Sequence, residues 1–358
     1  MRSFAVMAKI IIMFVCLLNL MVSAEAGSLP EKEKIFPEPK ILPITVSDSG
    51  GTLIYSDCPE YVKEPGILYS DVVSGNVRVF YYHLNDSHEP SKIAVLLKSV
   101  EKGLVANVTK GVISQPGEDY FAVGRGLQAQ YFSTESDKKE MLLVKSTKAR
   151  LLAPEMDEIV VRPAELISGV YDFSVNGQVR ITVLSYPAKE DPVKYLETAK
   201  MLPEEIENRE GTFSAMNREI TLCSPYNPST DGISCIVLGN DKEDYFLNGV
   251  SATDGQPVEN FGNYGVNYRI VLPIAEPGRT HYYLEPLGGV YSGIMRIHLG
   301  NNNSRLIFTP ESRYFGENGA GEYADLGAYD NNVPLWFEFS PPGASNLPVR
   351  IIMVPEIS

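Results

Sequence analysis

The chain has 358 residues and a formal net charge of −14, with 45 acidic residues against 31 basic ones. An acidic balance of this size argues against nucleic acid and anionic lipid headgroups as partners, since both require clustered Lys and Arg. The length exceeds what one hydrophobic core usually serves, so two domains are expected.

Residues 1–26 have the pattern of a cleavable secretory signal peptide. Arg2 and Lys9 give a positive start, Ile10 to Val22 form a mostly apolar run, and Ala24-Glu25-Ala26 supplies the small-x-small cleavage site. A run of about 13 residues is too short to cross a bilayer core of about 30 Å. The sequence therefore predicts cleavage before Gly27, no membrane span afterwards, and a secreted or extracytoplasmic protein associated with the cell envelope.

The rest of the chain has the pattern of a β protein. Residues 27–43 are polar and rich in proline, which predicts an extended tether. From Ile44 onward, short runs of β-branched and aromatic residues are separated by Gly, Pro, Asn and Asp. The clearest runs are 77–82, 93–97, 179–184 and 268–272. With 29 Gly and 25 Pro to interrupt helices, the sequence predicts an all-β fold of antiparallel sandwiches.

Several short segments recur in the same order in the two halves of the chain. The pairs are 118–121 with 243–246, 165–171 with 285–291, 179–181 with 295–297, and the segments that open at Gly66 and Gly211. This recurrence predicts two tandem Ig-like sandwiches, at 44–189 and 211–358, joined by a linker at 190–210. Asp191 followed by Pro192 predicts a short helix over 191–202 inside that linker.

One stretch of the chain resembles a known group of proteins. The run from Gly66 to His83 is similar to one in secreted bacterial envelope proteins of unassigned function, as are Gly169–Phe173 and Gly211–Phe213. Some of those proteins carry a copper-amine-oxidase-N-terminal-like stalk domain, which this sequence does not show. The resemblance implies a structural role and no copper chemistry, and the chain has four histidines without a His-x-His pair.

Three cysteines follow the predicted cleavage site. Cys223 and Cys235 flank a stretch containing Pro, Asn and Gly between two apolar segments, which predicts a hairpin loop closed by a disulfide. The alternative is a pair of buried thiols in neighbouring strands. Cys58 is then either buried or paired with another chain.

The sequence offers little catalytic or metal-binding chemistry. It contains no nucleophile elbow, His-Glu-x-x-His motif, Walker loop or dinucleotide fingerprint, so neither catalytic residues nor a cofactor are expected. His83 and His88 lie five residues apart without a cysteine or placed carboxylate, which is weak support for zinc. Oxygen ligands crowd residues 317–332, where Glu322, Asp325 and Asp330 are candidate calcium ligands, although EF-hand spacing is absent.

Aromatic residues near the C-terminus are the candidates for a binding surface. The second half continues past its Gly-Val-Tyr segment from Ser292 to Ser358 and contains a Gly-rich acidic loop at 316–332. Tyr323, Tyr329 and Trp336, the only tryptophan, are predicted to bind a glycan or protein partner. The alternative is that these side chains fill the core of the second sandwich.

These features predict a non-catalytic secreted or cell-surface protein that serves adhesion, envelope structure or ligand binding. One alternative is an extracellular glycan-active enzyme, which would need two acidic residues that the sequence does not identify. Another is an assembly subunit that adds an edge strand or the tether to a neighbour.

Overall fold

The computed structural model describes residues 36–101, 103–136, 140–144, 148–203, 209–300, 303–311 and 314–356. The predicted signal peptide at 1–26, the tether residues 27–35 and the linker residues 204–208 lie outside this described part. Phe36–Ser358 form one compact unit. The chain is 50% strand and 9% helix, which confirms the all-β prediction.

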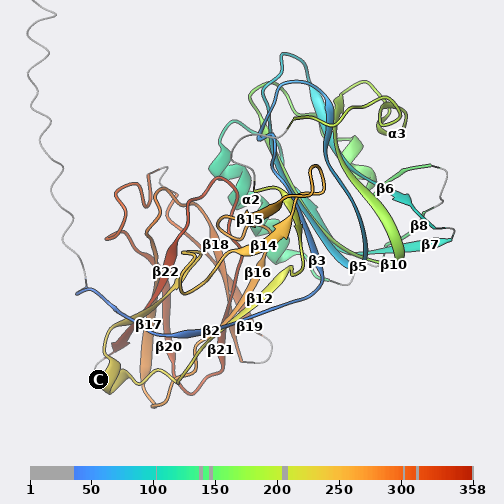
Figure 1. Ribbon diagram of the computed structural model, residues 1–358. Coiled ribbons are helices and arrows are strands. Elements are labelled where there is room, and N and C mark those ends of the chain that lie inside the picture. The colour runs from blue at the N-terminus through green and yellow to red at the C-terminus, as the bar shows by residue number, and fades with distance from the viewer. Residues whose placement is uncertain are drawn as a thin grey trace, which may run out of the picture. The chain divides into compact units, whose positions relative to one another are not determined.

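The strands form three sheets (Figure 1). The five-stranded sheet has the order β1 (Lys40–Ile41), β13 (Ser234–Leu238), β22 (Val349–Glu356), β17 (Arg279–Pro286), β20 (Ala324–Asp330). The six-stranded sheet has the order β19 (Asn303–Phe308), β18 (Ile294–Leu299), β21 (Leu335–Phe339), β16 (Asn267–Val271), β12 (Asn217–Leu222), β2 (Ile44–Ser49).

The third sheet has eleven strands and draws on both halves of the chain. Its main path is β15 (Pro257–Asn260), β14 (Leu247–Val250), β11 (Gly211–Phe213), β3 (Thr52–Ser56), β5 (Gly66–Asn85), β10 (Leu166–Pro187), β6 (Ser91–Ser99), β9 (Arg150–Leu151). Off this path, β4 (Tyr61–Val62) pairs with β5, and β7 (Leu104–Ile113) pairs with β10 and with β8 (Glu140–Val144). The predicted boundary at 190–210 therefore separates strands that share one sheet.

Two hydrophobic cores lie on opposite faces of the long strand β5. Val79 and Tyr81 belong to a core built entirely from residues between Ile54 and Leu202. Phe80 and Tyr82 belong to a second core that extends from Leu42 to Met353. Side chains alternate between the two faces of a strand, so one strand can serve both cores. This explains how the two halves are joined more closely than two tandem domains would be.

The sheets are also mixed, whereas the sequence predicted antiparallel pairing. β1 runs parallel to β13, β3 and β4 run parallel to β5, and β12 runs parallel to β16.

The segments that recur in the two halves of the sequence are not structurally equivalent throughout. Asp119 caps a helix, whereas its counterpart Asp244 is a buried carboxylate in a loop.

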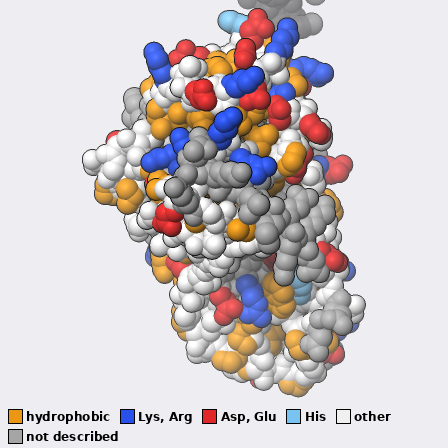
Figure 2. All heavy atoms as spheres, turned by 90° about the vertical axis from the view of Figure 1, so that its right-hand side faces the viewer, with side chains coloured by type: hydrophobic (Ala, Val, Ile, Leu, Met, Phe, Trp, Pro, Cys, Tyr) orange, Lys and Arg blue, Asp and Glu red, His pale blue; other side chains and the backbone are white. Residues whose placement is uncertain are grey.

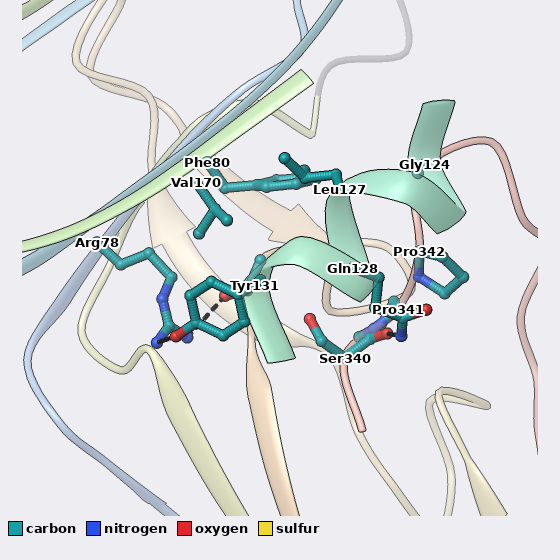
Figure 3. Close-up of a pocket in the computed structure, with 12 residues that line it drawn as sticks. Arg78, Phe80, Gly124, Leu127, Gln128, Tyr131, Val170, Ser340, Pro341 and Pro342 are labelled. Carbon is teal, nitrogen blue, oxygen red and sulfur yellow. Dashed lines mark hydrogen bonds between the residues drawn. The ribbon is translucent and has the colours of Figure 1, made fainter. Parts of the chain in front are cut away.

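The long helix α2 (Tyr120–Ser133) is the main element that the sequence did not predict. It packs Val123, Leu127 and Tyr131 against the sheet, and its Gln128 side chain donates to the carbonyl of Ser340 (2.6 Å) and accepts from the amide of Ile294 (2.6 Å). Figure 3 shows Tyr131 and Gln128 pointing from the helix toward Arg78 and Ser340. A cavity of only 30 Å³ remains at this contact, so the helix seals the junction rather than opening a site.

The remaining helices are single turns. The predicted linker helix begins as expected, with Asp191 capping Pro192, but α3 spans only Pro192–Tyr195. The 3₁₀ turn η1 covers Pro154–Asp157, and α4 covers Pro228–Asp231. None of the helices in the described part of the chain has the length and apolar character needed to cross a bilayer. The last residues of the predicted tether are part of the fold, because β1 pairs with β13.

The predicted disulfide is absent, and the hairpin prediction behind it is wrong. Cys223 follows β12 in the six-stranded sheet, whereas Cys235 lies on β13 in the five-stranded sheet. Neither residue forms a disulfide; Cys223 is exposed and Cys235 is buried, and Cys58 is buried as well. Residues 224–233 contain α4 and connect two sheets instead of turning back within one.

We expect the three thiols to differ sharply in reactivity. Iodoacetamide should label Cys223 in the native protein, whereas Cys58 and Cys235 should react only after unfolding. Burial raises the pKa of the Cys235 thiol to about 11, which further disfavours the reactive thiolate. Peptide mapping of labelled protein by mass spectrometry measures this order, and recovery of a cross-linked Cys223–Cys235 peptide would contradict it.

Candidate functional site

The structure brings together only part of the predicted binding surface. Tyr329, Trp336 and Asp330 border one groove of 370 Å³. Tyr323 lies before the start of β20, whereas Tyr329 lies near the end of that strand, so the two tyrosines are apart. The prediction of a Gly-rich loop over 316–332 is partly wrong, because strand β20 occupies Ala324–Asp330.

Three separate segments build the groove. The end of β16 and the segment 272–274 form one side, the turn 331–334 between β20 and β21 forms another, and Tyr282 of β17 lines the interior. Its walls are mainly apolar and include Tyr282 and Tyr329, and its polar residues are Arg269, Asp330, Asn331 and Asn332. A concave apolar surface with a few convergent polar groups is the usual form of a ligand site.

Trp336 lies at the end of this groove within a stack of three side chains. The His298 ring lies parallel to the indole, with centroids 3.5 Å apart and an interplanar angle of 6°. The Arg269 guanidinium carbon lies 5.1 Å from the indole centroid. Strand pairing explains this order, because His298 is directly opposite Trp336 and Arg269 is on the next strand. The neighbours restrict access to the indole faces, so a ligand would meet the half-buried ring mainly along its edge.

Charged groups continue along the same face of the six-stranded sheet. The Glu338 carboxylate accepts from Asn267 Nδ2 (3.0 Å), lies 3.2 Å from His298 Nε2 and pairs with Arg296 at 3.8 Å. Arg269 pairs with Glu219 at 2.6 Å, with both side chains 50% exposed. Burial lowers the pKa of His298, although the neighbouring Glu338 favours its charged form.

The turn beyond β20 supplies the free polar groups of the groove. Asn331 is committed to the fold, since its side chain accepts from Thr280 (2.9 Å) and donates to the carbonyl of Glu276 (3.1 Å). Asp330 accepts the Asn332 amide with one oxygen (2.9 Å) and is exposed. The Asn332 side chain is exposed and has no hydrogen bond among the described residues. Asp330 and Asn332 are thus the groups best placed to reach a ligand.

Tyr329 is mainly a structural residue. It is 9% exposed, its hydroxyl donates to the carbonyl of Leu326 (2.7 Å), and that hydroxyl accepts from Arg305. Beside it, Tyr282 packs edge-on against Phe337, with ring centroids 5.1 Å apart. Tyr329 therefore fits the alternative prediction of a residue that fills the core, although its ring also lines the groove.

Tyr323 and the calcium candidates lie elsewhere. Tyr323 packs against Phe36 and Tyr283, with ring centroids 5.2 and 6.3 Å away. Glu322 accepts the Gly316 amide, and Asp325 Oδ1 lies 2.7 Å from His281 Nε2. In the part of the chain that the structure describes, no three His, Cys, Asp or Glu side chains form a group that could hold a metal ion.

The structure also contains two features that sequence reasoning missed. Ser56 Oγ lies 3.0 Å from His83 Nε2, the spacing of a nucleophile and its base, but both residues are 0% exposed and no substrate can reach them. A second cavity, of 190 Å³, is lined by Tyr55, Tyr82, Tyr264 and Arg209 among others. Its Arg209 is committed to Asp57 at 2.8 Å.

Comparisons with known proteins do not identify this arrangement. No family model and no curated protein matches the chain. Among solved structures, a Paenibacillus xanthan lyase matches 92% of this chain at 11% identity with a TM-score of 0.19, and the match covers 27% of the lyase. A vicilin from hazelnut (Corylus avellana) matches 86% of this chain and 86% of its own chain, and one from tomato (Solanum lycopersicum) matches 84% of each. Their identities are 8% and 10%, and their TM-scores are 0.13 and 0.12. Similarity this low supports no conclusion about function.

Proposed function

We propose that this protein is a non-catalytic, extracytoplasmic glycan-binding protein, and that the groove beside Trp336 is its binding site. The observation that carries the proposal is the composition of the groove. Sugar rings present apolar C–H faces and edges together with many hydroxyl groups, so they suit apolar walls with a rim of amide, carboxylate and guanidinium groups. Asp330, Asn332 and Arg269 supply that rim beside the Trp336 edge.

Binding is favoured over hydrolysis by the number of acids in the groove. Most glycosidases use a pair of carboxylates on either side of the scissile bond. Among the described residues that line this groove, Asp330 is the one carboxylate. Export is supported by the pattern of residues 1–26, which places the protein where polysaccharides are abundant.

We also propose that the two halves are related sandwiches joined through β5 and β10. The support is the core drawn solely from residues 54–202 together with the ordered recurrence of short segments in the sequence.

The proposal predicts loss of binding on removal of the two rim side chains. A glycan array should first identify a polysaccharide that the wild type binds, and calorimetry then measures the affinity for its oligosaccharide. The double variant Asp330→Ala, Asn332→Ala should bind roughly 10- to 100-fold more weakly, because each lost hydrogen bond contributes about 1 kcal/mol. The melting temperature should change little, since both side chains are exposed.

Asp254→Ala is the matched control for this variant. Asp254 also accepts an amide two residues ahead, that of Gln256 (2.9 Å), but it lies in another turn. Its substitution should leave the affinity unchanged. Equal binding by the wild type and the double variant would reject the groove as the site, and release of reducing sugar ends from a bound glycan would reject the non-catalytic assignment.

A further inference from the structure

Lys110 is a buried cation that packs against an aromatic ring. The residue is 8% exposed, and its ammonium nitrogen lies 3.8 Å from the centroid of the Tyr131 ring. Among the described residues, no carboxylate lies within 4 Å of that nitrogen and no oxygen accepts a hydrogen bond from it. Burial of an ammonium group is costly unless it is paired, so natural proteins seldom retain one without a reason.

The neighbouring acids are already committed to other cations. Lys110 on β7, Asp172 on β10 and Arg78 on β5 form a row of directly paired positions. The Asp172 carboxylate takes two hydrogen bonds from Arg78 (2.6 and 2.8 Å) and one from the Tyr131 hydroxyl (2.8 Å). On the facing sheet, the Glu338 carboxylate is held by Asn267, His298 and Arg296, as described above.

The charges of this cluster do not balance. Four charged groups act electrostatically on Lys110: Glu338 and Asp172 carry two negative charges, and Arg78 and Arg296 carry two positive ones. These four balance one another, so the positive charge of Lys110 itself is left over. The excess of one positive charge is at odds with a chain whose net charge is −14. One bound anion would neutralise the cluster and give Lys110 its missing partner.

The cluster adjoins the groove on the same face of the six-stranded sheet. Glu338 is two residues beyond Trp336 on β21, which corresponds to about 7 Å along a strand. Arg296 occupies the position opposite Glu338 on β18 and bonds the Phe132 carbonyl (2.7 Å) at the end of α2. Figure 2 shows one side of the molecule, on which acidic, basic and hydrophobic side chains lie close together in the lower half.

We propose that Lys110, assisted by Arg296, binds the carboxylate of an acidic sugar in a glycan that extends from the groove beside Trp336. The identification as a sugar carboxylate rests on the proposed glycan-binding function, whereas the site for an anion rests on the unpaired lysine alone. A uronic acid residue combines the single negative charge that the cluster lacks with the sugar ring that the groove fits.

The test uses glucuronate as the probe and thermal unfolding of the full mature chain as the readout. At equal ionic strength and pH 7, glucuronate should raise the melting temperature of the wild type, whereas glucose and chloride should not, because ligand binding stabilises the native state. Lys110→Met should abolish the stabilisation. In the absence of ligand this variant should be at least as stable as the wild type, since it removes an unpaired buried charge. Lys98→Met, an exposed lysine on β6, is the control and should respond like the wild type.

The outcomes separate the two proposals. Equal effects of glucuronate and glucose, or a glucuronate effect that survives Lys110→Met, would overturn the carboxylate site even if the array identifies a glycan ligand. Stabilisation by phosphate but not by glucuronate would overturn the acidic sugar as the source of the anion. A Lys110-dependent glucuronate effect would support the anion site even if no polysaccharide on the array binds.

Discussion

Replacing Asp244 with alanine is expected to lower the free energy of unfolding by about 3 kcal/mol, because it removes a fully buried carboxylate that accepts three hydrogen bonds. The Arg218 guanidinium loses one of its two carboxylate partners and keeps the other, Asp48 (2.7 and 2.9 Å). Asp244 and Arg218 are 0% and 1% exposed. One Asp244 oxygen accepts from Arg218 (2.6 Å), and the other accepts from the Gly239 amide (2.7 Å) and the Tyr268 hydroxyl (3.0 Å). The substitution removes all three hydrogen bonds inside the second core. Urea unfolding measures the loss.

Glu219→Ala is the matched control for this substitution. Glu219 follows Arg218 on β12 but points to the other face, where it pairs with Arg269 in solvent. Exposed pairs of this kind contribute about 0–1 kcal/mol, so the control should remain close to the wild type. Similar losses from Asp244→Ala and Glu219→Ala would contradict this account.

Acid is expected to destabilise the protein through His83 between pH 6.5 and 4. His83 is 0% exposed, its Nδ1 donates to the Pro59 carbonyl (2.9 Å), and its Nε2 accepts from the Ser56 hydroxyl (3.0 Å). Burial lowers the pKa of this histidine from 6.5 to about 4. The unfolded chain therefore binds a proton at a pH where the folded chain does not, and stability falls as the pH drops through this window.

The expected loss from His83 amounts to about 3 kcal/mol across the window, given 1.36 kcal/mol for each pKa unit. Denaturant unfolding at several pH values measures it as the difference in slope between the wild type and His83→Gln. His88→Gln serves as the control, because His88 is exposed and should leave the slope unchanged. A His83→Gln variant with the same acid sensitivity as the wild type would contradict the assignment.

Local sequence patterns predicted the strands well and their partners poorly. The runs at 77–82 and 268–272 fall within β5 and β16, since β-branched and aromatic residues favour strands wherever they pair. Pairing depends on segments far apart in the chain. β2 pairs with β12, and β3 with β11, across more than 150 residues of the chain, and no local signal specifies this. The antiparallel tandem arrangement followed from assuming that neighbouring strands pair.

Helix α2 was missed for a related reason. Gly124 and Gly126 lower its intrinsic helix propensity, and the sequence alone gave no reason to accept them. In the structure, a Cβ at Gly124 would lie 2.2 Å from the carbonyl oxygen of Gly343, so glycine there allows the helix to approach the 340–343 segment. Gly124 lowers the helix propensity of this segment, yet the packing of the helix requires a glycine at this position.

The candidate site was predictable only in its aromatic part. Trp336 was a candidate because it is the single tryptophan, and Asp330 because it lies in an acidic run. Arg269, the 272–274 segment and Lys110 carry no motif, so only the folded structure identifies them as candidates. Tyr323 was chosen by the same compositional argument as Trp336, yet it packs against Phe36.

Occupation of the groove beside Trp336 by a glycan can be tested by the fluorescence of that residue. Trp336 is the only tryptophan, so the indole emission of the protein reports on this site alone. Titration with the oligosaccharide selected on the array should change the emission and reduce quenching by acrylamide, with a midpoint equal to the calorimetric dissociation constant. Binding detected by calorimetry without any change in emission or quenching would place the ligand outside this groove and contradict the proposed site.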